Sequence, residues 1–170
     1  MSPSKRIAFI TLGCKLNFSE TSSIARHFDE LGFDRVNPSS EADIYVINTC
    51  SVTEHADKKC RQAIKKIISK SPNAYIAVVG CYSQLNPDAI ASIPGVDLVL
   101  GSSEKNSIPM LIGDAKKNSK PKVYSCDVDL LDDFFPAYSS GDRTRSFLKV
   151  QDGCDYHCAY CTIPLARGKS

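Results

Sequence analysis

The feature that most constrains the fold is a regular alternation of short apolar runs with longer amphipathic ones through about the first hundred residues. Buried strands are predicted where β-branched and other apolar residues run together, at residues 6–13, 43–49, 74–80 and 96–101. Helices are predicted between and after them, at residues 19–33, from about 53 to 70, from about 87, and near 108–112. Strands that alternate with helices favour an α/β fold with a parallel sheet covered on both faces.

Specific residues mark the limits of two of these helices. In the first, Ile24, Phe28 and Leu31 share one face, and Gly32 is the expected C-terminal stop. Thr53 is a suitable N-cap for the second. The second helix also carries a run of basic residues, KKCRQAIKKIISK, which offers a possible RNA-facing surface. Its other face is apolar, so we interpret the basic residues as an ordinary solvated face. The apolar stripe consists of Ala63, Ile64, Ile67 and Ile68.

The pattern breaks after Gly113. A short possible strand at 123–128 is followed by the acidic and apolar stretch 129–136 and the polar stretch 139–145, which together are typical of a connector. A strand is predicted to resume at 146–153. We therefore expect a first domain at residues 4–115, a connector at 116–143, and the start of a second domain at 144–170.

Composition limits the functional classes without selecting one. The net charge of +2 does not indicate a polyanion partner, because nucleic-acid-binding domains are usually more basic. The N-terminus imitates a signal peptide, but its apolar run from Ile7 to Leu12 is short and suits a buried strand. No stretch approaches the length of a membrane span. We therefore expect a cytoplasmic protein with no membrane partner, in which the eight cysteines serve metal or redox chemistry or packing and not disulfides.

Three cysteines follow three predicted strands. Cys14 lies in TLGCKLN, Cys50 in INTCSVT and Cys81 in VVGCYSQ. The carboxyl ends of parallel strands share one edge of a sheet, and ligands bind in the crevice there, so we expect these thiols to converge. The N-termini of the following helices would stabilise thiolates or an anionic cluster at that edge.

A second group of cysteines, Cys154, Cys158 and Cys161, lies in the compact stretch CDYHCAYC. Its spacing supplies three ligands, which suits an iron–sulfur cubane with one open iron. A zinc site that recruits His157 as the fourth ligand is the alternative. Cys60 and Cys126 have no comparable placement and are interpreted as structural residues.

The C-x-x-x-C-x-x-C pattern, with Tyr160 just before the last cysteine, resembles the signature of radical S-adenosylmethionine (SAM) enzymes. Together with TLGCKLNFSET, INTCSVT, VVGCYSQ and KVQDGCDYHCAYCTIPLARGKS, it resembles the radical SAM methylthiotransferase family. TLGCKLN and IPLARGKS are most similar to the MtaB-type branch, which acts on threonylcarbamoyladenosine next to the anticodon in tRNA. Related branches act on isopentenyladenosine in tRNA or on a ribosomal protein.

The resemblance implies a Rossmann-like methylthiotransferase domain followed by the first strand and cluster loop of a truncated radical SAM (β/α) barrel. It implies two 4Fe-4S clusters, SAM, a tRNA substrate and a reductant such as a flavodoxin or ferredoxin. One cluster would be the auxiliary cluster and the other would bind SAM, with Tyr160 near the adenine of SAM. The implied ligands are Cys14, Cys50 and Cys81 for the auxiliary cluster, and Cys154, Cys158 and Cys161 for the SAM-binding cluster.

Two further expectations follow. Family members continue through a barrel and usually an RNA-binding domain, so we expect these 170 residues alone not to turn over. Arg167 and Lys169 could approach phosphate or the cofactor, and the sequence does not decide this. The competing hypothesis is a non-enzymatic zinc or iron–sulfur binding module, in which all ligands of one metal site come from the protein.

Overall fold

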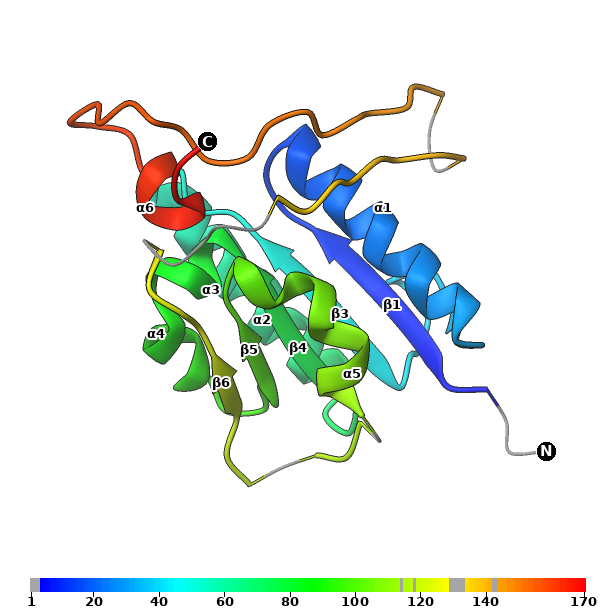
Figure 1. Ribbon diagram of the computed structural model, residues 1–170. Helices are drawn as coiled ribbons and strands as arrows, with labels where there is room; N and C mark the ends of the chain where they lie inside the picture. Colours follow the sequence, from blue (N-terminus) through cyan, green and yellow to red (C-terminus); the bar gives the residue numbers. More distant parts are fainter. Residues whose placement is uncertain (1–3, 114, 118, 129–133, 142–143) are drawn as a thin grey trace.

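Parallel strands build one central sheet in the computed structural model, which describes residues 4–113, 115–117, 119–128, 134–141 and 144–170 (Figure 1). Every neighbouring pair of strands in this sheet is parallel. The spatial order of the strands is β2-β1-β3-β4-β5-β6. Their bounds are β1 Arg6–Thr11, β2 Asp34–Arg35, β3 Ile44–Thr49, β4 Tyr75–Gly80, β5 Leu98–Leu100 and β6 Lys122–Tyr124.

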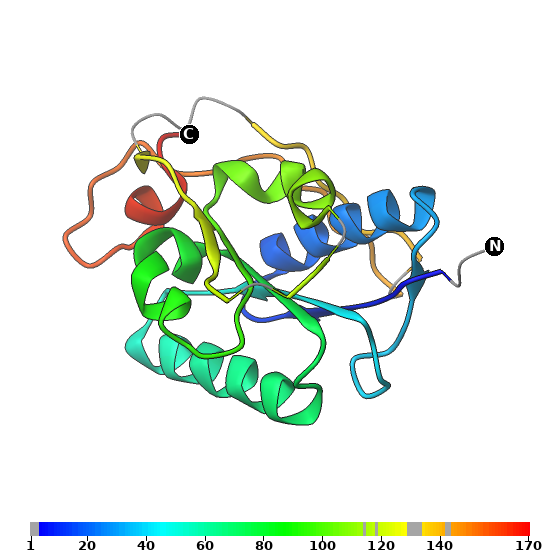
Figure 2. The same ribbon diagram turned by 90° about the horizontal axis from the view of Figure 1, so that it is seen from below.

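Helices cover both faces of the sheet, as the alternating pattern predicts. Helices α1 and α5 lie on one face, and α2, α3 and α4 lie on the other (Figure 2). A short 3-10 helix, η1, precedes α5, and α6 is the last helix of the chain. The bounds are α1 Lys15–Glu30, α2 Glu54–Lys70, α3 Cys81–Leu85, α4 Pro87–Ala91, η1 Ser103–Ser107, α5 Ile108–Ile112 and α6 Ile163–Arg167.

The strand order creates a switch point next to β1. From β1 the chain moves outward to β2, then crosses to the other side of β1 to form β3, and continues outward from there. The order β2-β1-β3-β4-β5 is one of the two common doubly wound arrangements. In such sheets the ligand crevice lies at the carboxyl ends of the two strands where the direction reverses, which here are β1 and β3.

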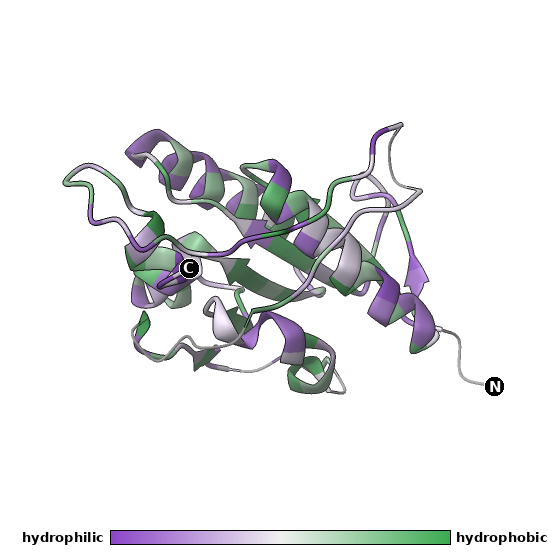
Figure 3. Cartoon of the chain, turned by 45° about the horizontal axis from the view of Figure 1, so that its top comes forward, coloured by the Kyte–Doolittle hydropathy of each residue, from purple (hydrophilic) through white to green (hydrophobic). Residues whose placement is uncertain are grey.

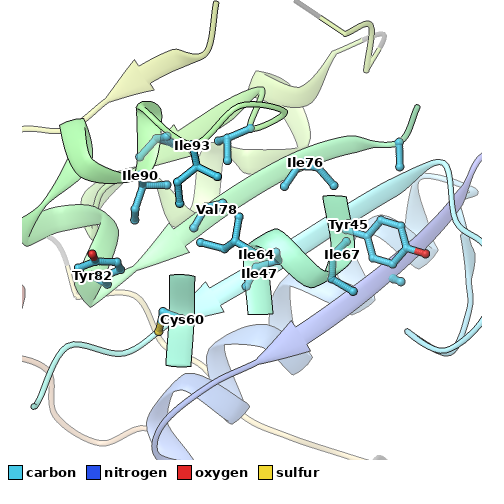
Figure 4. Packing of buried hydrophobic residues seen from close by; sticks show 14 of the residues in the cluster. Tyr45, Ile47, Cys60, Ile64, Ile67, Ile76, Val78, Tyr82, Ile90 and Ile93 are labelled. Carbon is cyan, nitrogen blue, oxygen red and sulfur yellow. The ribbon is translucent and has the colours of Figure 1, made fainter. Parts of the chain in front are cut away.

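The core consists of two apolar layers, one on each face of the sheet. Alternate residues of β3 belong to opposite layers. Tyr45 and Ile47 face α2, and Ile44 and Val46 face α1. Figure 4 shows the α2 layer, where Ile64 of α2 packs with the apolar side chains of β3 and β4. Figure 3 shows the resulting hydropathy pattern, with green strands inside and helices that are green on one side and purple on the other.

Most predicted elements are confirmed, with one change at the first helix. Helix α1 begins at Lys15, four residues before the predicted start, because Cys14 is already its N-cap. Leu31, predicted to be on the buried face, is 54% exposed because it follows the last helical residue. Gly32 ends the helix as predicted, with a φ of +83°. Thr53 is confirmed as the N-cap of α2, since its Oγ1 accepts a hydrogen bond from the amide of Ala56 at 3.1 Å.

The connector and the segment after it differ from the prediction. Of the possible strand at 123–128, only Val123 and Tyr124 belong to β6, and the sequence did not indicate the two-residue β2. The strand predicted at 146–153 is wrong. Leu148 forms only an isolated antiparallel bridge with Tyr138, because no parallel neighbour lies beside it in the described residues. Residues 129–133 and 142–143 of the predicted connector lie outside the described residues.

Within the described ranges, no helix is both long enough and apolar enough to cross a membrane.

We expect Ile64→Ala to destabilise the fold by about 3 kcal/mol, because Ile64 is fully buried in the α2 layer and the truncation leaves a cavity. Lys65→Ala on the exposed side of the same helix is the control and should change stability by less than about 0.5 kcal/mol. Urea denaturation followed by circular dichroism measures both. Equal stabilities for the two variants would contradict the packing described here.

Candidate functional site

The structure places the first group of cysteines at the carboxyl edge of the sheet, as predicted. Cys14 is the N-cap of α1, and Cys81 is the first residue of α3. Thr49 pairs with Gly80 in the parallel register, so Cys50 and Cys81 each follow directly after paired positions of β3 and β4. Cys14 and Cys50 therefore flank the switch point, with Cys81 on the next strand.

The three thiols interact electrostatically. Burial raises the pKa of the Cys50 thiol, and the negative charges of Cys81 and Cys14 raise it further. Cys50 and Cys81 are buried, whereas Cys14 is exposed. Across the described ranges, however, no three Cys, His, Asp or Glu side chains are assembled tightly enough to hold a metal ion. The predicted ligands therefore lie at one edge of the sheet, but in the described residues they do not form an assembled metal site.

Two glycines allow the cysteine-bearing loops to approach each other. Gly13 has a φ of +104°, and a Cβ atom there would lie 2.5 Å from the Cβ of Cys50. Gly80 has a φ of +108°, and a Cβ atom there would lie 2.5 Å from the carbonyl oxygen of Thr49. A larger residue would clash with the Cys50 side chain at position 13 and with the Thr49 backbone at position 80. Three thiols on closely approaching glycine-bounded loops fit a thiolate-ligated cluster.

Asn17, a buried polar residue in the first turn of α1, connects the same loops. Its Nδ2 donates to the carbonyl of Leu12 at 2.8 Å and to the carbonyl of Thr49 at 2.9 Å. Its Oδ1 lies 3.9 Å from the Cys14 sulfur. One buried side chain thus connects the ends of β1 and β3, each beside a cysteine.

The second group of cysteines lies in an irregular loop that precedes α6. Cys158 is exposed, and Cys154 and Cys161 are partly buried. The amide of Cys161 donates to the carbonyl of Cys158 at 3.0 Å, which closes a turn. The side chain of Tyr160, predicted to lie near the SAM adenine, is 91% exposed. These thiols are near in sequence but, like those of the first group, they are not assembled around a common point in the part of the chain described.

Hydrogen bonds bring this second loop to the edge that carries the first group. The Thr162 hydroxyl donates to the carbonyl of Ser51 at 3.2 Å, which joins the residue after Cys161 to the residue after Cys50. The segment from orange to red in Figure 1 crosses the end of the sheet toward which the β1 arrow points, and α6 contacts α3 there. Both groups of cysteines therefore lie at one edge of the molecule.

A buried ionic network, which the sequence did not indicate, lies beside them. Glu20 of α1 is fully buried and pairs with three cations, at 2.8 Å from Lys105, 3.0 Å from Lys149 and 2.8 Å from Arg167. Asp152 pairs with Arg167 at 2.7 Å and also with Lys149. Of the two residues whose approach to phosphate or the cofactor the sequence left undecided, Arg167 is buried in this network, whereas Lys169 is exposed.

The network controls the ionisation of its members. Burial alone would raise the pKa of Glu20, but the charges of Lys105 and Arg167 outweigh it and hold the pKa well below its ordinary value. Burial alone would lower the pKa of Arg167, but Glu20 and then Cys81 hold it above its ordinary value. The guanidinium also donates to Asn17 at 2.7 Å, and Asn17 connects the ends of β1 and β3, so Arg167 lies beside the sheet edge that carries the first cysteine group.

The two remaining cysteines take separate places. The Cys60 thiol is buried and donates to the carbonyl of Cys50 at 3.2 Å, and burial raises its pKa to about 11. Cys126 is half-buried, with its sulfur 3.1 Å from the Ser103 hydroxyl. All eight cysteines are within the described residues, and all are free thiols.

Comparison with known proteins gives one family match and several similar relatives. The family described as Uncharacterized protein family UPF0004 matches residues 6–101. The chain is 41% identical over 172 residues to "Threonylcarbamoyladenosine tRNA methylthiotransferase MtaB" of Bacillus subtilis, covering 95% of this chain and 36% of the relative. It is 36% identical to the protein of the same name in Aquifex aeolicus, covering 96% of this chain and 40% of that relative.

A relative of a different name is also similar. The "tRNA-2-methylthio-N(6)-dimethylallyladenosine synthase" of Geotalea uraniireducens is 30% identical, covering 99% of this chain and 40% of the relative. This chain thus spans well under half the length of the relatives that it matches.

We expect Glu20→Gln to cost about 3 kcal/mol of stability at pH 7, because it leaves buried cations without their shared carboxylate. The folded-state pKa of Glu20 lies below its ordinary value of 4.5, so its contribution is complete above that value and is lost as the pH falls further. The stability difference between wild type and variant should therefore be constant from pH 7 to about 5 and narrow in more acid solution. Urea unfolding at a series of pH values measures this.

Glu30→Gln is the matched control, because Glu30 is an exposed residue of the same helix. It should have little effect at any of these pH values. A stability difference for Glu20→Gln that stays unchanged in acid would contradict the buried ion pairs.

Proposed function

This chain belongs to the UPF0004 family, and on that premise we propose that it forms the N-terminal part of a radical SAM methylthiotransferase that modifies tRNA. We propose threonylcarbamoyladenosine next to the anticodon as the modified nucleoside and carbon 2 of its adenine as the site of methylthiolation. The names of the Bacillus subtilis and Aquifex aeolicus relatives support this substrate.

The observation that carries the proposal is the gathering of both cysteine groups at one sheet edge. Cys14, Cys50 and Cys81 would hold the auxiliary 4Fe-4S cluster at the switch point of the sheet. Cys154, Cys158 and Cys161 would hold the SAM-binding cluster in the adjoining loop. The thiol donors and the glycines at 13 and 80 suit such ligation. When bound, the clusters and SAM supply radical and sulfur-transfer chemistry that amino-acid side chains do not provide.

The protein's own residues have simpler tasks in this proposal. Gly13 and Gly80 let the ligand-bearing loops approach, and Asn17 holds the ends of β1 and β3 in place. Tyr160 has its ring exposed, so it is free to contact the adenine of SAM. The free thiols suit a reducing cytoplasm and a low-potential reductant of the flavodoxin or ferredoxin type.

We expect anaerobic reconstitution of the chain to give about eight irons and eight sulfides per molecule, as two cubane clusters require. Replacing Cys14, Cys50 and Cys81 together by serine should remove about half of the iron, and so should replacing Cys154, Cys158 and Cys161 together. The control is a Cys60→Ser and Cys126→Ser double variant, which should keep the full iron content. Iron and sulfide assays with Mössbauer spectroscopy measure the result.

Two results would contradict the cluster assignment. Stoichiometric zinc in a colourless protein would favour a zinc-binding module. A single cluster that is lost with either triple substitution would favour an electron-carrying module whose ligands all come from the protein.

We test the enzymatic part with a chimera in which residues 1–170 replace the matching part of the Bacillus subtilis relative, to which they are 41% identical. The chimera should restore the 2-methylthio group on tRNA in a strain that lacks the relative, as measured by mass spectrometry of nucleosides. The Cys14, Cys50 and Cys81 triple variant of the same chimera should not. A chimera that carries both clusters but does not methylthiolate tRNA would contradict the proposal.

A further inference from the structure

We infer that Asn17, Arg167 and Asp152 form a hydrogen-bonded bridge that fixes the position of one cysteine group relative to the other. These are positioning residues, because none of them is a proposed metal ligand. The inference rests on the proposed function, in which each cysteine group holds its own metal centre.

Arg167 is the central member of the bridge. Its Nη2 donates to Asn17 Oδ1 at 2.7 Å, and its Nη1 donates to Asp152 Oδ1 at 2.7 Å and to Glu20 Oε1 at 2.8 Å. The guanidinium is buried among these partners. Its planar fork can hold separate acceptors at fixed angles, whereas the single ammonium group of a lysine cannot.

One end of the bridge reaches the first cysteine group through Asn17. The Asn17 side-chain amide is bonded to the carbonyls of Leu12 and Thr49, which lie close before Cys14 and Cys50 in the sequence. Its Oδ1 is therefore held in place by the ends of two buried strands. Arg167 binds this immobilised oxygen and not a mobile surface group.

The other end reaches the second cysteine group through Asp152. Asp152 Oδ1 also accepts a hydrogen bond from the amide of Gly153 at 3.1 Å. The amide of Cys154 donates to the carbonyl of Gly168 at 3.0 Å, directly after Arg167. A Cβ atom at Gly153 would lie 2.2 Å from the carbonyl oxygen of Lys169, so the two chain segments are in close contact. The position of Arg167 thus determines the position of Cys154, the first residue of the loop.

Glu20 anchors the bridge by charge. It is bound by Arg167, Lys105 and Lys149, which come from three separate segments of the chain. The Lys149 ammonium also lies 5.4 Å from the centre of the Phe134 ring and 5.8 Å from that of Phe135. Buried charges that lose a partner are strongly destabilising, so this arrangement resists displacement.

The proposed reaction gives this rigidity a purpose. In the proposed function both centres would act on one substrate, so the residues that would hold them would need a constant separation. A misplacement of about 1 Å can lower a rate about a hundredfold. We therefore assign the bridge to the geometry between the two centres and not to ligation at either.

The test is Arg167→Lys in the 170-residue chain, with Arg145→Lys as the control, since Arg145 is exposed. We expect amide hydrogen exchange of residues 152–168 to become at least about tenfold faster in Arg167→Lys, because bonds to a charged group are lost. Exchange in β3 and β4 should stay unchanged in both variants. Unaltered exchange of residues 152–168 in Arg167→Lys would overturn the bridge.

A spectroscopic measurement separates positioning from mere stability. In the anaerobically reconstituted and reduced chain, we expect electron paramagnetic resonance to show a defined magnetic interaction between two clusters in wild type and in Arg145→Lys. In Arg167→Lys the iron content should persist while that interaction weakens or becomes heterogeneous. An identical interaction in all three proteins would overturn the positioning role.

If the wild-type chain does not bind two clusters, the proposed function fails. Hydrogen exchange alone then decides whether the bridge holds residues 152–168. If Arg167→Lys does not fold, Asp152→Asn takes its place, because it removes one charge while keeping the size of the side chain. Faster exchange at residues 152–154 in that variant supports the bridge, and unchanged exchange overturns it.

Discussion

The ion pairs of the buried Glu20 are the interaction on which the arrangement of the carboxyl edge of the sheet, with its two cysteine groups, depends. A carboxylate with no exposed surface must be compensated, and here Lys105, Lys149 and Arg167 compensate it from distant parts of the chain. Removing such ions from water costs about as much as their attraction returns, so the net gain in stability is small. What the network provides is geometry, because the segment around α6 must dock where Arg167 reaches both Glu20 and Asp152.

The apolar core and the ionic network determine different things. The two layers of the core fix β1, β3, β4 and β5, and hence the positions at which β1, β3 and β4 end. The switch point between β1 and β3 then places Cys14 and Cys50 on either side of the position where sheets of this topology bind ligands. Nothing in the core specifies what covers this edge of the sheet. That is decided by polar contacts, namely those of Arg167 and the hydrogen bond from Thr162 to Ser51.

The sequence predicted the parts of the structure that follow from local patterns. Apolar runs identified β1, β3, β4 and β5, and parallel topology then placed Cys14, Cys50 and Cys81 at one edge. It failed at the two-residue β2, which is too short to show a period, and at 146–153, where alternating residues form a bridge and not a strand. It missed the Glu20 network because the partners are 85, 129 and 147 residues away, a separation that no spacing rule addresses.

The composition of the network also explains why it lies beside thiols. Three cations and two carboxylates leave one positive charge in a buried region, and such an excess is unfavourable unless negative charge lies nearby. Arg167 donates to Asn17 at 2.7 Å, and Asn17 connects the ends of β1 and β3 beside Cys14 and Cys50, so this edge lies within reach of that excess. Thiolates at this edge would supply the missing negative charge. The guanidinium that binds Asp152 just before the second cysteine group therefore also lies where negative charge at the first group would be compensated.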